Sequence, residues 1–378
     1  MDKIFYGRQL IDKKDINLVS KALKKNLITS GPLVHKFENN ISKYLKVKKT
    51  TVCNSGTTAI HLAFDAINLK KDDVIIMPAI NFISSYNMAK LYSAKIYLCD
   101  VNPLNGLVTP EKLLECINKY KLKKIKCILI MHLGGIVENS EKFFQIKKKY
   151  KCYLIEDACH AFGSSYKIKD KKYMVGSCKH SDISCFSFHP IKTITTGEGG
   201  AMTTNNNFFY KRSISFRSHN INKKNFYHYD IDRLGFNYRL SDINCALGIS
   251  QLKKVNKFIE KRRKIRQFYK HKLRSLKSEV KIIDTDSLAK NSNHLLIIQL
   301  KNSKIKREFI KFFYSHNIFV QYHYIPIYKF NYIKSYSRKN FSGSEYYFKR
   351  SISIPNHAGL KKKELNKIIY LFYKFFKV

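Results

Sequence analysis

Short apolar runs alternate with amphipathic segments between about residue 50 and residue 205, and this alternation constrains the fold more than any other feature of the sequence. The apolar runs have the length of buried strands, and the clearest are DVIIMP (73–78), KIYLCDV (95–101), KCILIMH (126–132), CYLIEDA (152–158), DISCFSF (182–188) and GGAMTT (199–204). Two other segments of this region, 56–68 and 139–150, repeat apolar residues at helical spacing. This pattern predicts an α/β domain built on a mostly parallel sheet.

The character of the sequence changes near residue 275. Residues 237–273 have the pattern of one or two helices ending in a strongly basic face. After them come the segments NHLLIIQL (293–300), IFVQYHYIPIY (318–328), SISIPNHAGL (351–360) and KKKELNKIIYLFYKFF (361–376). Because a single core stops growing at roughly 250 to 300 residues, we expect a large domain over 1–250 and, over 251–378, a linking helix and a smaller α+β domain.

The formal net charge of +44 could indicate a nucleic acid or an anionic membrane as partner. The excess is mostly Lys, it is scattered along the sequence, and no Arg stands between Arg8 and Arg212. Arg is the residue that best makes paired contacts with phosphates and guanine. We therefore interpret the charge as drift in base composition, since Lys, Asn, Ile, Tyr and Phe are all plentiful, and we keep a nucleic-acid-binding protein as the alternative from another class.

The nine cysteines contain no C-x-x-C pair and no metal-ligand spacing, so we expect neither a disulfide framework nor a metal site. The first ten residues, MDKIFYGRQL, lack the apolar run of a signal peptide. No window approaches the roughly 18 apolar residues of a membrane span. These features favour a soluble, cytoplasmic protein with no membrane partner.

Ligands of parallel α/β sheets bind beyond the carboxyl ends of strands, so polar residues just after the apolar runs carry the most information. Ser55, Gly56, Thr57 and Thr58 stand between a short apolar run and a helix. Free N–H groups at a helix N-terminus attract a phosphate, but the same residues also make an ordinary helix cap. Both interpretations stay open.

We call the chain just beyond the carboxyl end of a predicted strand a strand exit, and the residues at 55–58 form the first. A second strand exit carries Glu156, Asp157 and His160. A carboxylate at this place can cap a helix, bind a metal or pair with a cationic nitrogen of a ligand. No P-loop GKS or GKT is present, which argues against Mg²⁺ and a nucleotide triphosphatase.

The stretch FSFHPIKTITTGEGGAM (186–202) forms a third exit and holds Ser187 and Lys192. The amine of a lysine on a tight loop beyond a buried strand can be desolvated, which lowers its pKa and makes it a nucleophile. Together the exits supply candidates for the four requirements of pyridoxal phosphate, which are a lysine, an anion site, a carboxylate and a flat apolar partner, here Phe82.

Six segments that span most of the chain stand in the order NSGTTA, PAINF, IEDACHAFGS, FSFHPIKTITTGEGGA, GFNYRLSDINCALG and QYHYIPIY. This ordered set resembles the DegT/DnrJ/EryC1/StrS family of pyridoxal-phosphate-dependent sugar aminotransferases. The resemblance implies the type I aminotransferase fold. Within the family it is strongest to the pseudaminic acid branch, which implies amination of UDP-4-keto-6-deoxy-N-acetyl-β-L-altrosamine at C4 with L-glutamate as donor.

The resemblance also implies roles for single residues. Lys192 would bond to the cofactor aldehyde and act as nucleophile and general acid/base, Asp157 would pair with the pyridinium nitrogen, and His160 would lie near the ring hydroxyl. Phe82 would stack on the ring. Gly56, Thr57 and Ser187 would hold the phosphate, together with Asn237 of a neighbouring subunit in a homodimer. The site for the sugar nucleotide would be lined by Tyr6, Asn26, Leu27, Ile28, Thr29, Gln321, Tyr322, His323 and Tyr324.

Some family members carry His at the lysine position and act as dehydratases, so the presence of Lys192 favours transamination. The segment 26–29 varies in composition, which leaves another UDP- or GDP-linked keto sugar, of the bacillosamine, legionaminic acid or perosamine type, as the alternative substrate.

Overall fold

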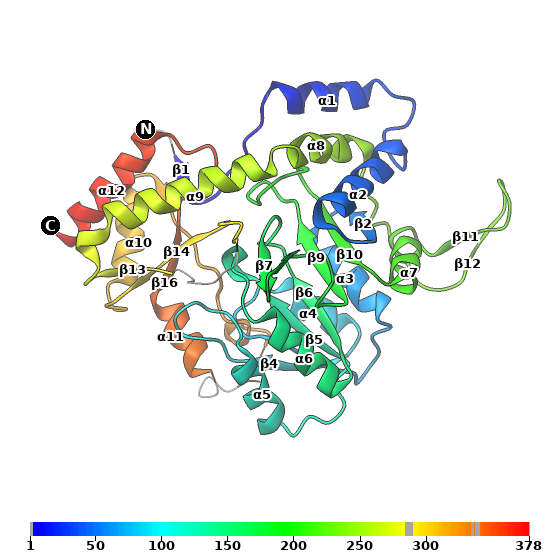
Figure 1. The fold of residues 1–378 in the computed structure, drawn as a ribbon, viewed down its shortest axis with the longest axis horizontal. Coiled ribbons are helices and arrows are strands. Elements are labelled where there is room, and N and C mark those ends of the chain that lie inside the picture. Colours follow the sequence, from blue (N-terminus) through cyan, green and yellow to red (C-terminus); the bar gives the residue numbers. More distant parts are fainter. Residues whose placement is uncertain (1–2, 284–289, 334–335, 337–340, 378) are drawn as a thin grey trace.

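The computed structural model describes residues 3–283, 290–333, 336 and 341–377 (Figure 1). Its centre is a seven-stranded sheet in which all neighbouring strands are parallel except in the two pairs that β10 makes, because β10 runs antiparallel to both of its neighbours. The order across the sheet is β2 (Lys49–Cys53), β10 (Gly200–Thr204), β9 (Ile183–Ser187), β6 (Tyr153–Asp157), β5 (Cys127–Met131), β3 (Val74–Pro78) and β4 (Lys95–Cys99). The prediction of an α/β fold on a mostly parallel sheet is confirmed, and all six predicted runs contain strands. The edge strand β2 was not among them.

The strands read as continuous apolar runs because the sheet is buried on both faces. Along β3, Ile75 and Met77 face one hydrophobic cluster, whereas Ile76 faces another. The first cluster includes residues of α3 (Gly56–Ala66), α4 (Ser84–Leu91) and α7 (Asn207–Arg217), and the second those of α5 (Pro110–Lys119) and α6 (Ser140–Tyr150). A third cluster joins the sheet to α2 (Pro32–Leu45), α8 (Asp242–Leu252) and the start of α9 (Val255–Lys272). Helix α1 (Lys13–Leu23) packs on α8.

The C-terminal part has its own antiparallel sheet. Strand β14 (Leu296–Leu300) pairs with β13 (Val280–Ile282) and with β16 (Ser351–Ile354). Its core includes side chains of α9, α10 (Lys306–Ser315) and α12 (Lys362–Phe376), while α11 (Ser342–Arg350) leads into β16. Figure 1 shows α9 running from α8 to this part, so one helix links the two sheets. The boundary at residues 250/251 stays a prediction.

The N-terminal strand joins the C-terminal part. Strand β1 (Ile4–Phe5) pairs in parallel with β15 (Ile318–Phe319), and Ile4 is buried in the C-terminal core. The next residues of both strands, Tyr6 and Gln321–Tyr324, are thereby brought near each other, as the ring contact between Tyr6 and His323 at 5.1 Å shows. Residues from opposite ends of the chain that were predicted to line one substrate site therefore lie close together.

Two hairpins were not anticipated from the sequence. Strands β7 (Ser165–Ile168) and β8 (Lys171–Met174) form one of them. The other, β11 (Ile221–Lys223) with β12 (Tyr229–Ile231), projects away from the body of the molecule (Figure 1). Its strands are exposed throughout.

Among the residues that the structure describes, no helix is long and apolar enough to cross a membrane. No cluster of His, Cys, Asp or Glu in those residues is arranged to hold a metal ion, and the nine cysteines are free thiols.

Candidate active site

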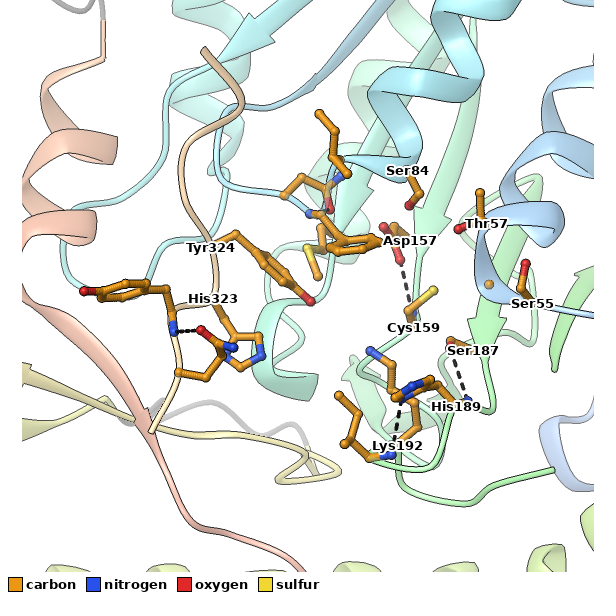
Figure 2. Close-up of a pocket in the computed structure, with 18 of the residues that line it drawn as sticks. Ser55, Thr57, Ser84, Asp157, Cys159, Ser187, His189, Lys192, His323 and Tyr324 are labelled. Atoms are coloured by element: carbon orange, nitrogen blue, oxygen red, sulfur yellow. Dashed lines mark hydrogen bonds between the residues drawn. The ribbon is translucent and has the colours of Figure 1, made fainter. Parts of the chain in front are cut away.

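A cavity of about 460 Å³ opens where the carboxyl ends of β3, β5, β6 and β9 meet the N-terminus of α3 (Figure 2). Loop residues from the C-terminal part form its opposite side. Most of the residues singled out from the sequence line it, namely Tyr6, Gly56, Thr57, Phe82, Asp157, Ser187, Lys192, Gln321, Tyr322, His323 and Tyr324. The fold thus brings together groups from the whole length of the chain.

The start of α3 serves both as a cap and as one side of the cavity. The Ser55 hydroxyl accepts from the Thr58 N–H at 3.1 Å, and the Thr58 hydroxyl accepts from the Ser55 N–H at 3.1 Å, which makes a capping box. Gly56 and Thr57 lie between them and face the cavity. A Cβ on Gly56 would come within 2.8 Å of the Ser187 Cβ, so only glycine leaves this space open. The cap interpretation is confirmed for Ser55 and Thr58, whereas a phosphate site at Gly56 and Thr57 stays a prediction.

Neighbouring residues on β6 point to opposite faces, and this separates the two carboxylates of the second exit. Glu156 points away from the cavity and pairs with His132 at 3.2 Å. Asp157 faces the cavity and is only 1% exposed. Its two oxygens accept from the Cys159 N–H at 3.2 Å and from the Ser85 hydroxyl at 3.5 Å, and no described cation forms an ion pair with it.

A buried carboxylate without a cation is costly unless a ligand supplies the positive charge. Asp157 therefore fits a site for a cationic nitrogen.

Lys192 reaches into the cavity on the side of Asp157 and Cys159 (Figure 2). Burial lowers the pKa of its amine, while the Cys159 thiol and the Asp157 carboxylate oppose this shift. A lowered pKa increases the fraction of free amine, which is the nucleophilic form. The Lys192 N–H donates to the His189 carbonyl at 2.9 Å, so the loop makes a tight turn at this residue.

Phe82 is an aromatic residue left open to the cavity, and it is 50% exposed. Its ring lies 5.7 Å from that of Tyr324. Exposed aromatic faces inside a cavity are suited to stacking on a flat ring.

Tyr324 is oriented by a chain of hydrogen bonds. The Gly134 N–H donates to Nδ1 of His160 at 3.2 Å, and Nε2 of His160 lies 2.8 Å from the Tyr324 hydroxyl oxygen. Burial lowers the pKa of His160 well below its usual value, so the ring is neutral and its one proton is on Nε2. His160 therefore donates to Tyr324, and the hydroxyl proton of Tyr324 is left to point into the cavity.

Several predicted residues lie outside the cavity. His160 stands behind Tyr324. The Asn237 carbonyl accepts from the Asn54 side chain at 3.4 Å. The segment 26–29 lies against the start of α8, where the Asp242 N–H donates to the Ile28 carbonyl at 2.9 Å and Thr29 bridges to Ser241. The roles given to these residues stay predictions.

Other residues of the cavity were missed. They are Asn81, Ile83, Ser84, Met131, Cys159, Ile191, Glu198, Ile325 and Phe330. Ser55, which the sequence singles out beside Gly56, and His189, which belongs to the Lys192 stretch, also line the cavity. Many of the missed residues also follow strands, so applying the rule of strand exits to the chain after β3 would have indicated Asn81 and Ser84. Cys159 lies between Asp157 and the Gly56 turn, and burial raises the pKa of its thiol well above its usual value.

These groups fit pyridoxal phosphate. The buried Asp157 carboxylate suits the pyridinium nitrogen, the space kept open by Gly56 at the N-terminus of α3 suits the phosphate, Phe82 suits the ring, and Lys192 suits the aldehyde.

Comparison with known proteins points the same way. The profile of the DegT/DnrJ/EryC1/StrS aminotransferase family matches residues 9–372. The UDP-4-amino-4,6-dideoxy-N-acetyl-β-L-altrosamine transaminase of Campylobacter jejuni strain 81-176 is 37% identical over 366 residues, which cover 96% of this chain and 94% of that protein. The GDP-perosamine synthase of Escherichia coli O157:H7 is 34% identical over 264 residues, which cover 70% and 69%.

A solved structure is also similar. Helicobacter pylori PseC, an aminotransferase involved in the biosynthesis of pseudoaminic acid, superposes with a TM-score of 0.92 at 28% identity, covering 100% of both chains.

Proposed function

The chain belongs to the DegT/DnrJ/EryC1/StrS aminotransferase family and is a pyridoxal-phosphate-dependent sugar aminotransferase, and from this premise we propose its substrates. They are UDP-4-keto-6-deoxy-N-acetyl-β-L-altrosamine, aminated at C4, and L-glutamate as the amino donor. The observation that carries the proposal is the 37% identity to the Campylobacter transaminase over 96% of the chain. Family membership favours this enzyme over the nucleic-acid-binding alternative.

When bound, pyridoxal phosphate supplies an electron sink for the carbon attached to the amino nitrogen. The chain supplies the rest. Lys192 would hold the cofactor covalently, and its Nζ, free once the amino donor is bound, would accept a proton from the donor's α-carbon and give it back on the cofactor side. Asp157 would pair with the ring nitrogen and keep it protonated. With the sugar bound, Nζ of Lys192 would move the proton in the opposite direction, so that the amino group goes to the sugar.

We expect the sugar to bind beside Tyr6 and Gln321–Tyr324, because these residues line the same cavity as Lys192. The outward proton of Tyr324 offers a hydrogen bond to a substrate oxygen.

Product analysis tests the substrate. Purified enzyme, L-glutamate and a panel of UDP- and GDP-linked 4-keto sugars are incubated, and the products are identified by mass spectrometry and NMR. We expect the altrosamine precursor to give the highest kcat/KM. The 34% identity to a GDP-perosamine synthase makes a GDP-linked 4-keto sugar the second candidate, and preference for that sugar would overturn the proposal.

We also propose a homodimer with shared sites. Two observations support it. Asn237 lies outside the cavity of its own chain, and it follows the β11–β12 hairpin, whose tip exposes Phe226 at 93% and Tyr227 at 74%. Exposed apolar side chains on a projecting arm are typical of a protein interface.

Mixing two inactive variants tests this sharing. Lys192→Ala and Asn237→Ala proteins are unfolded, mixed and refolded together. If Asn237 acts across the interface, each heterodimer has one intact site and the mixture regains about a quarter of wild-type activity. No recovery in a mixture shown to contain heterodimers would place Asn237 outside the partner's site.

A further inference from the structure

A buried arginine lies behind the loop that carries Lys192. Arg262 belongs to α9, the helix that links the two sheets, and it is 2% exposed. Its guanidinium donates only to backbone carbonyls: Nη2 to Lys192 at 3.2 Å, Nη1 to Thr193 at 3.4 Å and Nε to Asn356 at 3.4 Å. Two of these carbonyls lie on the Lys192 loop, and the third follows β16 in the C-terminal part.

Arg262 carries its charge without a carboxylate partner in the described part of the chain. Burial lowers the pKa of its guanidinium to about 10, which leaves it protonated at neutral pH. A buried cation without a counterion is unfavourable for stability. A hydrophobic side chain of similar size would fill the same space without the desolvation free energy of a charge. A planar fork with five N–H donors can, however, reach three carbonyls on two segments at once.

The third carbonyl connects this contact to the substrate side of the cavity. The Asn356 N–H donates to the Tyr6 carbonyl at 3.0 Å, and Tyr6 lines the same cavity as Lys192. Arg262 therefore joins the backbone that carries the lysine to a C-terminal segment that holds the backbone of Tyr6.

We propose that Arg262 is a positioning residue, which fixes the main chain of Lys192 so that the amine keeps its place when it is released from the cofactor and must move protons. The inference rests on the proposed function, because only an enzyme that frees and recaptures its lysine needs this loop to stay fixed without the covalent bond. The same contacts in a purely structural role would affect the free energy of unfolding but not the reactivity of Lys192 in the folded protein.

The neighbouring residue provides a matched control. Arg263 is exposed and pairs with Glu260 at 2.8 Å on the outer face of α9. We compare Arg262→Met and Arg262→Lys with Arg263→Met and Arg263→Lys. Methionine keeps the volume without the donors, whereas lysine keeps the charge but not the fork.

Two readouts report on Lys192. The first is the rate at which cofactor-free protein captures added pyridoxal phosphate covalently, followed by absorbance and by borohydride trapping at Lys192 with mass spectrometry. The second is the separation of kcat from KM. For Arg262→Met we expect capture and kcat to fall by about ten- to a hundredfold, because misplacing a reacting group by about 1 Å costs this much. KM should change little, Arg262→Lys should be intermediate, and the Arg263 variants should match wild type.

Normal capture and kcat in folded Arg262→Met, measured well below its unfolding temperature, would overturn the proposal. If circular dichroism shows that Arg262→Met does not fold, capture and kcat of Arg262→Lys are compared with those of Arg263→Lys, and equal values would overturn the proposal. Failure of both Arg262 variants to fold would also count against it, because Arg262 would then be a folding determinant. Wild-type protein that captures no pyridoxal phosphate would instead contradict the proposed function.

Discussion

The two walls of the cavity are built in different ways. The first wall consists of Gly56, Thr57, Asp157, Ser187 and Lys192, which stand at strand exits and a helix N-terminus of the large sheet. The second wall consists of Tyr6 and Gln321–Tyr324, which belong to irregular chain after β1 and β15.

Side chains rather than a sheet ladder hold most of the second wall. His323 Nδ1 and the Ser353 hydroxyl lie 2.8 Å apart, and the Tyr347 hydroxyl donates to the His323 carbonyl at 2.9 Å. The Lys306 ammonium lies 4.3 Å from the centre of the Tyr322 ring. Chemistry needs fixed positions, while recognition can be changed by altering a few side chains. We therefore expect changes in the first wall to lower kcat and changes in the second wall to raise KM for the sugar.

The largest effect is expected at Lys192. Lys192→Ala removes the proposed nucleophile and proton carrier together, so kcat should fall by at least about 10³-fold. Steady-state kinetics measures the loss, and circular dichroism checks that the fold is intact. A folded variant with wild-type turnover would end the assignment of Lys192.

The next effect is expected at Asp157. Asp157→Asn keeps the size of the side chain but cannot balance a protonated ring nitrogen, so kcat should fall by about 10²- to 10³-fold. Ser85→Ala removes only one donor to this carboxylate and is the milder control. A change in KM alone would break the distinction between the two walls.

A smaller effect, of the opposite kind, is expected at Tyr324. Tyr324→Phe removes the hydroxyl that His160 orients, and a lost hydrogen bond of about 0.5 to 1.5 kcal/mol corresponds to a two- to tenfold rise in KM. Kinetics with the sugar varied and glutamate saturating measures it. If kcat falls instead, Tyr324 belongs functionally with the first wall.

The smallest effect is a pH dependence at Lys306. Burial lowers the pKa of this amine from 10.5 to about 7, and the ammonium donates to the Phe348 carbonyl and lies over the rings of Tyr322 and Phe348. Raising the pH through about 7 discharges it and weakens the cation–π contact that holds Tyr322. KM for the sugar should then rise modestly, and the rise should be absent in Lys306→Met but present in the exposed control Lys304→Met.

The same titration determines whether the free energy of unfolding rises or falls with pH. The unfolded chain keeps the Lys306 proton up to about 10.5, so between pH 7 and 10.5 unfolding takes up a proton and the free energy of unfolding gains a contribution that increases with pH. Thermal unfolding of Lys306→Met across this range should lack that contribution.

The contrast between the walls also explains what could be predicted from the sequence. Strand runs and the residues that follow them indicated Gly56, Asp157 and Lys192, because parallel strands place their carboxyl ends at one edge. Nothing in local pattern places Tyr6 beside His323, since this contact depends on a strand pair between distant segments. Only the family resemblance indicated those residues.

Some features depend on packing that a sequence does not display. Alternation along β6 decides that Asp157 and not Glu156 faces the cavity, and the starting point of that alternation is set by the register with β5. Arg262 reads as one more charge in a basic helix until the fold places it beneath Lys192.

The pairing of β1 with β15 has a consequence for synthesis of the chain. Ile4 and Phe5 leave the ribosome roughly 300 residues before the strand they need, and contacts of such long sequence separation form late. The second wall can therefore assemble only when nearly the whole chain has been made. A nascent chain that has completed the large sheet would already hold the lysine and the carboxylate, but it would lack the surface proposed to select the sugar.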